Sequence, residues 1–233
     1  MQGNNEIGNL NDLERIGQMT QAHGAFFHSD TVQTVGHYAH DLSKLPVDAL
    51  VAGAHKFHGP KGVGFLYVRK DKKIHPFIHG GAQERNMRGG TENVIGIIGL
   101  ATALEISLVE LAAHRNQIEK IKGYFVERLR QEIPGIAFNG HSADLQKSLY
   151  TVLSISLPPS ASNRGMLLFH LDLEGISASG GSACSSGATV GSHVLRALQH
   201  SPERDAVRFS FSRFTTMEEV DYTLEKLKGL YSA

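Results

Sequence analysis

Apolar and polar residues follow one another along the first part of the chain in a pattern that predicts alternating helices and strands. Residues 11–23 predict a helix with Leu13, Ile16 and Thr20 on one side, before a glycine that ends it. Short, largely apolar runs follow at 25–29, 47–51 and 62–68, and these predict strands. Alternation of this kind indicates an α/β domain.

The middle of the chain, residues 93–132, has a helical pattern throughout, and we expect two helices there. The second helix has an apolar stripe at Ile118, Ile121, Phe125 and Leu129. Pro134-Gly135 then ends the pattern. We expect the domain boundary inside this helical stretch, with residues 1–110 forming part of a large α/β domain and residues 111–233 forming a smaller α+β domain.

The C-terminal part mixes strands with short helices. Residues 151–157 predict a strand by their alternation, residues 166–171 a short helix, and residues 207–212 another strand. The last helix is expected to begin at Thr216, because Glu219 three residues later completes the spacing of a capping box. Its apolar positions are Val220, Leu224 and Leu227.

Composition and charge exclude several classes of protein. The 233 residues include 23 basic and 23 acidic side chains, so there is no electrostatic case for binding nucleic acid or an anionic membrane. No apolar run approaches the roughly 20 residues of a membrane-spanning helix, and no signal peptide is recognisable. A single cysteine excludes an internal disulfide and fits a reducing, cytoplasmic compartment.

Lys56 is the strongest indication of chemistry in the sequence. It lies in a Gly/Pro-rich stretch, Gly53 to Gly62, directly ahead of a predicted strand, so the backbone that carries it is expected to be fixed. A lysine amine has an ordinary pKa of about 10.4 and becomes nucleophilic at neutral pH only through burial or a nearby cation. The setting favours a lysine that forms a Schiff base, and a solvated surface lysine is the alternative.

Polar residues upstream of Lys56 suit a pyridine ring. Asp30 follows the predicted strand 25–29, and ligands bind at the carboxyl ends of strands in open α/β sheets. A carboxylate there can pair with the ring nitrogen of pyridoxal phosphate and keep it protonated. Gln33 and Asn5 are candidates for hydrogen bonds to the phenolic oxygen. Turn, cap or ordinary loop roles are the alternatives for these three residues.

Cys184 is the only cysteine, and it lies in the small, polar, glycine-rich run 177–188. Nothing in this run is expected to bury the sulfur, and exposure together with thiolate character controls the reactivity of a cysteine. The setting therefore favours a reactive nucleophile over a passive buried residue.

The 13 histidines do not predict a metal site. The pairs His37/His40 and His75/His79 have ligand-like separations, but Pro76 breaks helical geometry in the second pair. No further cysteine is available to complete a tetrahedral site. A serine hydrolase is also not indicated, because the chain has no Gly-x-Ser-x-Gly sequence.

Six segments, in this order and at about these spacings, resemble those of cysteine desulfurases of the iron–sulfur cluster assembly branch, within the class V aminotransferases. They are residues 4–8 (Asn-Asn-Glu-Ile-Gly), residues 30–36, His55-Lys56 with its Gly-Pro-Lys-Gly tail, residues 88–91, residues 182–184 and residues 208–216. The resemblance covers essentially the whole chain. It implies the C-terminal part of the pyridoxal-phosphate transferase fold, with part of the large α/β domain and the small α+β domain.

The resemblance also implies how a cofactor would be bound. Lys56 would hold pyridoxal 5'-phosphate as a Schiff base and then move protons, with His55 assisting. Asp30 would pair with the ring nitrogen, and Gln33 and Asn5 would contact the phenolic oxygen.

The same resemblance implies the substrate, the sulfur acceptor and the partners. Arg208, together with Asn5, would bind the carboxylate of L-cysteine, since a planar guanidinium can donate two parallel hydrogen bonds. Cys184 would attack the substrate sulfur, releasing L-alanine and keeping a persulfide for delivery to a sulfur-acceptor or scaffold protein. Thr91 would reach the phosphate in a neighbouring subunit, which implies a homodimer.

Two departures from the family pattern change this expectation. Gly53 stands where the family has a serine that contacts the phosphate, so one hydroxyl donor is lost. Relatives also carry a long segment ahead of the Asn-Asn-Glu motif, with a phosphate-binding turn and a residue stacked on the ring. We therefore expect weak cofactor binding by this chain alone and activity only with a separate N-terminal chain. The rival hypothesis is a catalytically incompetent homologue that serves as a binding or scaffold partner.

Overall fold

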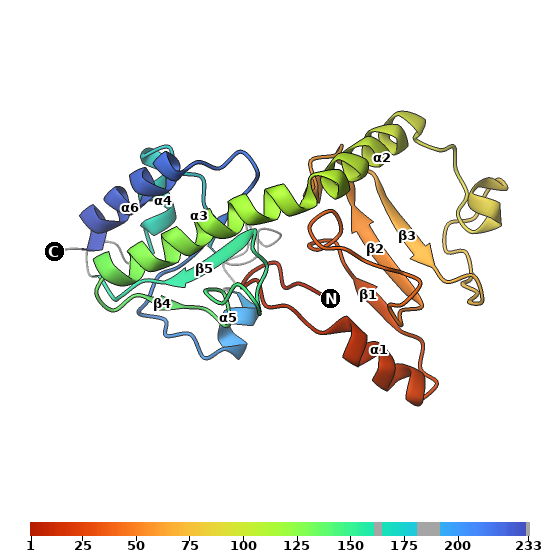
Figure 1. The fold of residues 1–233 in the computed structure, drawn as a ribbon, viewed down its shortest axis with the longest axis horizontal. Helices are drawn as coiled ribbons and strands as arrows, with labels where there is room; N and C mark the ends of the chain where they lie inside the picture. The colour runs from red at the N-terminus through yellow and green to blue at the C-terminus, as the bar shows by residue number, and fades with distance from the viewer. Residues whose placement is uncertain (161–164, 181–191, 232–233) are drawn as a thin grey trace. The chain divides into compact units, whose positions relative to one another are not determined.

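The computed structural model describes residues 1–160, 165–180 and 192–231, which pack into two units (Figure 1). Unit 1 comprises Met1–Gln2 and Asn11–Leu111, and unit 2 comprises Gly3–Leu10 and Ala112–Ala233. Residues 3–10 belong to unit 2 because their backbone bonds to the segment around residue 148, whereas the division expected from sequence placed them in the first domain.

Unit 1 is built on a three-stranded sheet of order β1-β2-β3. Strand β1 (His28–Asp30) runs parallel to β2 (Ala49–Gly53), and β3 (Gly64–Val68) runs antiparallel to β2. The helices are α1 (Leu13–Ala22) and α2 (Val94–Val109), with short 3-10 turns η1 (Ala54–Lys56) and η2 (Gln83–Asn86). The core gathers side chains from helices, strands and turns: Leu13, Val35, Val47, Leu50, Phe57 and Leu100.

The strand predicted at 25–29 lies a few residues later in the structure. Only residues 28–30 form β1, and Phe26 is exposed. The backbone N–H of Phe27 donates to the Asp48 carboxylate at 2.8 Å, while its carbonyl accepts the N–H groups of Asp48 and Ala49 at 2.9 and 3.2 Å. The correction places Asp30 inside the strand, as its last residue.

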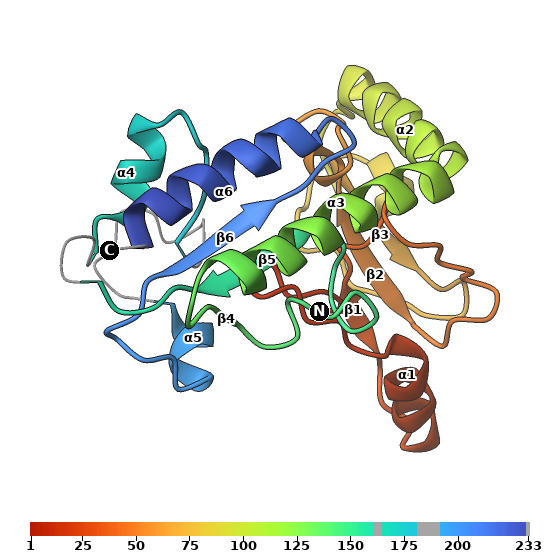
Figure 2. The same cartoon turned by 60° about the vertical axis from the view of Figure 1, so that its left-hand side comes forward.

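Unit 2 contains an antiparallel sheet of order β4-β5-β6. Its strands are β4 (Ala137–Phe138), β5 (Val152–Ser156) and β6 (Ala206–Ser210), and its helices are α3 (Leu111–Glu132), α4 (Leu167–Leu173), α5 (His193–Ala197) and α6 (Met217–Tyr231). Figure 2 shows α3 and α6 side by side along this sheet. Phe125 of α3 packs edge-on against the rings of Phe209 and Phe211.

The apolar stripes predicted for α3 and α6 are confirmed, and the strand predicted at 151–157 is confirmed as β5. All four residues of the α3 stripe are buried, as are Val220, Leu224 and Leu227 of α6. The Thr216 N–H donates to the Glu219 carboxylate at 2.9 Å, while the Glu219 N–H donates to Thr216 Oγ1 at 3.3 Å, so both bonds of the capping box form. All five residues of β5, its two serines included, are buried in this central strand of the sheet.

Candidate active site

In unit 1, parallel pairing brings Asp30 and Lys56 to the same edge of the sheet. Asp30 ends β1 and lies opposite Val51 in the register with β2. Strand β2 continues to Gly53, and the chain then turns directly into η1, whose last residue is Lys56. Since β1 and β2 are parallel, Asp30 at the end of β1 and Lys56 just after β2 both lie at the carboxyl edge, the position at which ligands bind in open α/β sheets.

The turn after Asp30 is held by side-chain hydrogen bonds. Asp30 Oδ1 accepts the N–H of Val32 at 2.9 Å, which fixes the orientation of the carboxylate. Thr31 is fully buried and its hydroxyl donates to the Val51 carbonyl at 2.7 Å, which ties the turn to β2. Gln33 lies in this turn and is partly exposed. Asp30 therefore stabilises a turn, which was the alternative interpretation of this residue. Its place at the end of the strand also allows it to contact a ligand.

The backbone around Lys56 is fixed while its side chain is exposed. His37 Nε2 donates to the Lys56 carbonyl oxygen at 2.9 Å, and the next residue, Phe57, is buried. Gly36 has φ +80°, and a Cβ atom built on it would lie 2.5 Å from Phe57 Cβ, so only glycine allows this approach. The spacing of His37 from His40 suggested only a metal ligand, and nothing in it indicated a bond to Lys56.

Gly53 and His55 contact one another. A Cβ atom built on Gly53 would lie 3.2 Å from His55 Cε1 and 3.8 Å from Val32 Cγ1, so the imidazole lies over the glycine. A serine at this position would crowd the ring by a few tenths of an ångström. The replacement that removes a hydroxyl donor thus also makes room for His55, which is exposed next to Lys56.

Thr91 is exposed and lies between η2 and α2, just after Gly90. Among the hydrogen bonds of the described residues, none joins it to Asp30, Gln33 or Lys56. It therefore lies in the same unit as these residues without a hydrogen bond to them in the described part of the chain.

In unit 2, Arg208 is half-buried on β6 and is held on two sides. Its Nη1 donates to the Asn5 carbonyl oxygen at 2.7 Å, and its Nη2 donates to Ser179 Oγ at 3.1 Å. The backbones of Arg208 and Ser179 also exchange hydrogen bonds of 2.7 and 3.1 Å. Asn5 thus meets the candidate substrate-binding arginine through its backbone, a contact that the sequence did not predict.

Cys184 lies outside the described residues. The remaining predicted site residues fall into two groups: Asp30, Gln33, His55, Lys56 and Thr91 in unit 1, and Asn5 and Arg208 in unit 2. Hydrogen bonds within unit 1 hold Asp30 and the backbone of Lys56, and a hydrogen bond within unit 2 joins Asn5 to Arg208.

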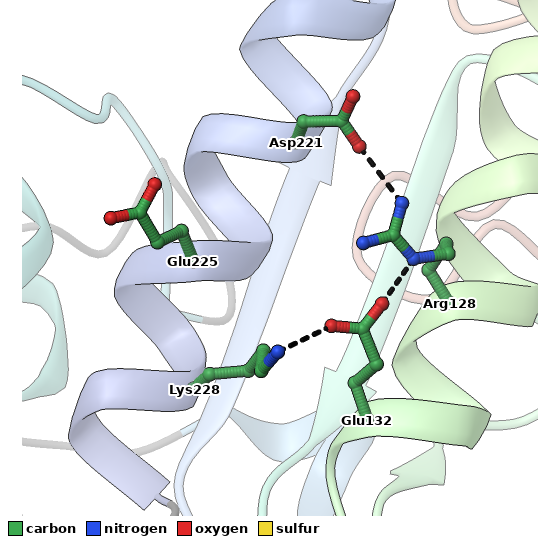
Figure 3. A pocket seen from close by; sticks show the side chains of 5 residues that line it. All are labelled: Arg128, Glu132, Asp221, Glu225 and Lys228. Atoms are coloured by element: carbon green, nitrogen blue, oxygen red, sulfur yellow. Dashed lines mark hydrogen bonds and ion pairs between the residues drawn. The ribbon is translucent and has the colours of Figure 1, made fainter.

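A charged depression of about 350 Å³ between α3 and α6 is a different kind of feature (Figure 3). Arg128 pairs with Asp221 at 3.0 Å and also with Glu132, and Lys228 pairs with Glu132 at 2.8 Å. The two cations lower the pKa of Glu132 to about 2. Because the opposite charges in this cluster already pair with one another, we interpret it as a set of ion pairs that stabilises the packing of α3 against α6.

No group of three or more metal-ligating side chains lies close together in residues 1–160, 165–180 and 192–231. His37 is bound to the Lys56 carbonyl, and His40 Nε2 lies 2.7 Å from Gln2 Oε1. In the same ranges, no single helix is both long and apolar enough to cross a membrane, and α2 with α3 meets that criterion only as a broken pair.

The family model for aminotransferase class V matches residues 1–223. The chain therefore belongs to the class V aminotransferases, a family that depends on pyridoxal phosphate. Within that family it is a homologue of cysteine desulfurases.

Two relatives and two solved structures illustrate this homology. The cysteine desulfurase IscS of Dictyoglomus turgidum is 40% identical over 232 residues, covering 99% of this chain and 58% of the relative. The enzyme of the same name from Methanosarcina thermophila is 40% identical over 227 residues, covering 97% of this chain and 55% of the relative. A solved NifS-like protein is 38% identical with a TM-score of 0.85, and one from Rickettsia africae is 27% identical with a TM-score of 0.86.

The two solved chains are matched over 100% of this chain and 60% and 61% of their own lengths, so the chain spans less than two thirds of each of these proteins. The expected fold class is confirmed, since the matched part of these NifS-like structures carries the same α/β architecture.

Proposed function

We propose that this chain provides the lysine- and arginine-bearing part of a cysteine desulfurase site, which converts L-cysteine to L-alanine and transfers sulfur to Cys184. The observation that carries the proposal is the parallel pairing of β1 with β2, which brings Asp30 and Lys56 to one carboxyl edge. Homology to cysteine desulfurases at 40% identity supports it.

The residues at this edge fit pyridoxal phosphate, which when bound supplies an electron sink for the substrate α-carbon. Lys56 offers an exposed amine on a fixed backbone, and Asp30 offers a carboxylate whose orientation is set by Val32. The backbone at Gly53 has no side chain of its own, so a phosphate oxygen could approach its N–H. Gln33, Asn5 and Thr91 remain proposed contacts.

Three residues would act on protons and on the substrate. Lys56 would accept and return protons at the substrate carbons, and His55 beside it would assist. Arg208 would bind the substrate carboxylate by charge-assisted hydrogen bonds. Its bonds to Asn5 and Ser179 hold the guanidinium plane in place before substrate arrives, which reduces the entropy lost on binding.

The proposed sulfur transfer balances without an external oxidant or reductant. The Cβ–S bond of L-cysteine breaks as a new S–S bond forms to the sulfur of Cys184. The carbon fragment gains a proton and leaves as L-alanine, and Cys184 keeps the persulfide. A sulfur-acceptor protein would then take the outer sulfur, and a homodimer would place Thr91 near a second site.

The test is reconstitution with pyridoxal phosphate followed by borohydride reduction and peptide mapping. We expect a visible absorption band that disappears on reduction and a reduced adduct at Lys56, which Lys56→Ala removes and Lys61→Ala leaves unchanged. Alanine formation is assayed with the chain alone. It is then assayed with a second polypeptide, which supplies the part of a relative that this chain does not match. An adduct at Lys44 or Lys61 would refute the assignment of the lysine.

The second candidate function is that of a non-catalytic binding partner, favoured by the apolar surface of α2. Ile95 is 86% exposed and Val109 is 80% exposed, and Val94 and Ile98 are exposed as well. Exposed apolar side chains at this density mark an interaction surface. Absence of colour and of alanine in both assay arms, with the chain folded, would favour this candidate.

A further inference from the structure

The turn at residues 4–8 is built by Asn4 and faces two different partners within unit 2. Asn4 Oδ1 accepts the N–H of Glu6 at 2.9 Å and that of Ile7 at 3.0 Å, which closes the turn locally. The carbonyl of Asn5 receives Arg208 Nη1 at 2.7 Å. Glu6, the next residue, bonds through its side chain to a different partner, Ser192.

Glu6 is only 3% exposed, and its carboxylate accepts the hydroxyl of Ser192. A buried carboxylate is costly unless its charge is met by hydrogen bonds or an opposite charge. The hydroxyl of Ser192 is also the N-cap of α5, since it accepts the N–H of Leu195 at 3.1 Å. One hydroxyl therefore donates to the turn and accepts from the helix, which fixes the start of α5 against residues 4–8.

Ser179 and Ser192 flank, in sequence, the segment that contains Cys184. Ser179 is paired through backbone and side chain with Arg208, whose guanidinium is bound to Asn5. Ser192 is bound to Glu6. The residues on both sides of the cysteine segment are thus held, directly or through Arg208, by two consecutive residues of one turn.

We propose that Glu6 is a positioning residue, which through Ser192 fixes the first described residue after the cysteine-bearing segment, on the turn that also holds Arg208. This inference rests on the proposed desulfurase function for its catalytic consequence. Glu6 touches no reacting atom in it. Its effect is to keep a constant distance between Ser192, which follows the sulfur-accepting segment in sequence, and the carboxylate-binding Arg208.

The variants separate this role from simple loss of stability. Glu6→Ala removes the acceptor, whereas Glu6→Gln keeps an oxygen that Ser192 can reach. Ser192→Ala removes the donor together with the cap of α5, so the double variant Glu6→Ala/Ser192→Ala measures the coupling between the two. Thr216→Ala is the matched control, because it removes an N-cap in the same unit without touching residues 4–8.

The first readout needs no activity: the rate at which iodoacetamide alkylates Cys184, the only thiol in the chain. We expect Glu6→Ala and Ser192→Ala each to change this rate by about threefold or more, as for loss of one hydrogen bond, and the double variant to add little. Glu6→Gln and Thr216→Ala should stay close to the parent rate. Unchanged alkylation in Glu6→Ala, or an equal change in Thr216→Ala, would overturn the proposal.

The second readout is steady-state alanine formation in the assembly that the reconstitution test identifies as active. We expect Glu6→Ala to lower kcat by about tenfold while KM for L-cysteine changes less than about twofold, because Arg208 keeps its bonds to Asn5 and Ser179. Glu6→Gln should restore most of kcat. A parent assembly that makes no alanine would refute the proposed function, whereas the alkylation result would still decide the role of Glu6.

Discussion

Lys122 is the residue whose environment departs most from what the sequence predicts. It lies on α3, next in sequence to the buried Ile121, and it is itself fully buried. Its Nζ donates to Ser148 Oγ at 2.9 Å and to the Leu149 carbonyl at 2.7 Å. Helical periodicity alone cannot distinguish such a lysine from a solvated one, because only the tertiary fold supplies the acceptors.

Burial lowers the pKa of Lys122 to about 7, with Glu119 and Asp144 opposing the shift. In the unfolded chain the pKa returns to its ordinary value of 10.5. Between these values the unfolded state binds more protons, so this group makes the free energy of unfolding rise as pH increases from about 7 toward 10.5. Below about pH 7 its contribution is constant.

We therefore expect Lys122→Met to remove part of the increase in stability that the parent protein shows between about pH 7 and pH 9. Urea unfolding at the two pH values measures the difference. Lys120→Met is the control, because Lys120 is exposed on the same helix and should leave the pH dependence unchanged. Equal slopes for the parent and Lys122→Met would contradict the shifted pKa.

Arg208 and Cys184 are expected to fail in different ways when substituted. Arg208→Lys keeps the charge but loses the planar fork, so KM for L-cysteine should rise by about tenfold or more, the equivalent of one charge-assisted hydrogen bond of roughly 1.5–3 kcal/mol. Cys184→Ala should keep cofactor binding and lose persulfide and sulfide production. Absorbance titration with L-cysteine and sulfide assays compare the two, and identical defects in both would mean that the roles are wrongly assigned.

Among the elements, those with long periodic patterns were predicted well, and those fixed by tertiary contacts were not. Thr216 and Glu219 indicated the start of α6 because a capping box is a local arrangement of four residues. Strand β4, of two residues, and helix α5, of five, are too short to carry a period. The strand expected at 25–29 moved because Phe27 bonds to Asp48, which is distant in sequence.

The turn that leads from β1 to His37 gives a prediction at this scale. Gly36→Ala should destabilise unit 1 by more than Gly24→Ala, because both glycines have positive φ but only Gly36 approaches Phe57. At Gly24 a Cβ atom would meet nothing within 4 Å, so that variant measures backbone strain alone. Thermal unfolding gives the comparison, and equal losses would mean that the contact with Phe57 relaxes at little cost.

For the whole molecule, the proposed homodimer gives α2 a role. Its side chains at Ile95 and Ile98 are exposed, and Thr91 lies two residues before Asn93, the N-cap of the helix. We expect the chain to associate through this surface, and the double variant Ile95→Glu/Ile98→Glu to shift it toward the monomer in light scattering. Met19→Glu, at an exposed apolar position of α1, should leave association unchanged. A monomeric parent protein would contradict the proposal.

At this scale the sequence predicted the fold class and the family, because the order and spacing of the motifs can be recognised without the structure. It did not predict that Asn5 bonds to Arg208 and Glu6 to Ser192 within unit 2, since that depends on backbone bonds between residues 8–10 and residues 147–149. The candidate residues were therefore named from motifs, while their grouping in space came from the structure.

Asp30 illustrates how one side chain can answer to two separate requirements. The turn after β1 needs only an oxygen that accepts the N–H of Val32, and the amide oxygen of an asparagine would supply it equally well. Protonating a pyridine nitrogen needs the negative charge, which asparagine lacks. Folding thus requires one oxygen of this residue, whereas the proposed cofactor chemistry requires its negative charge. A descendant that had abandoned catalysis could drift to asparagine here without losing its turn, so the identity of this residue is a marker of function that stability alone would not preserve.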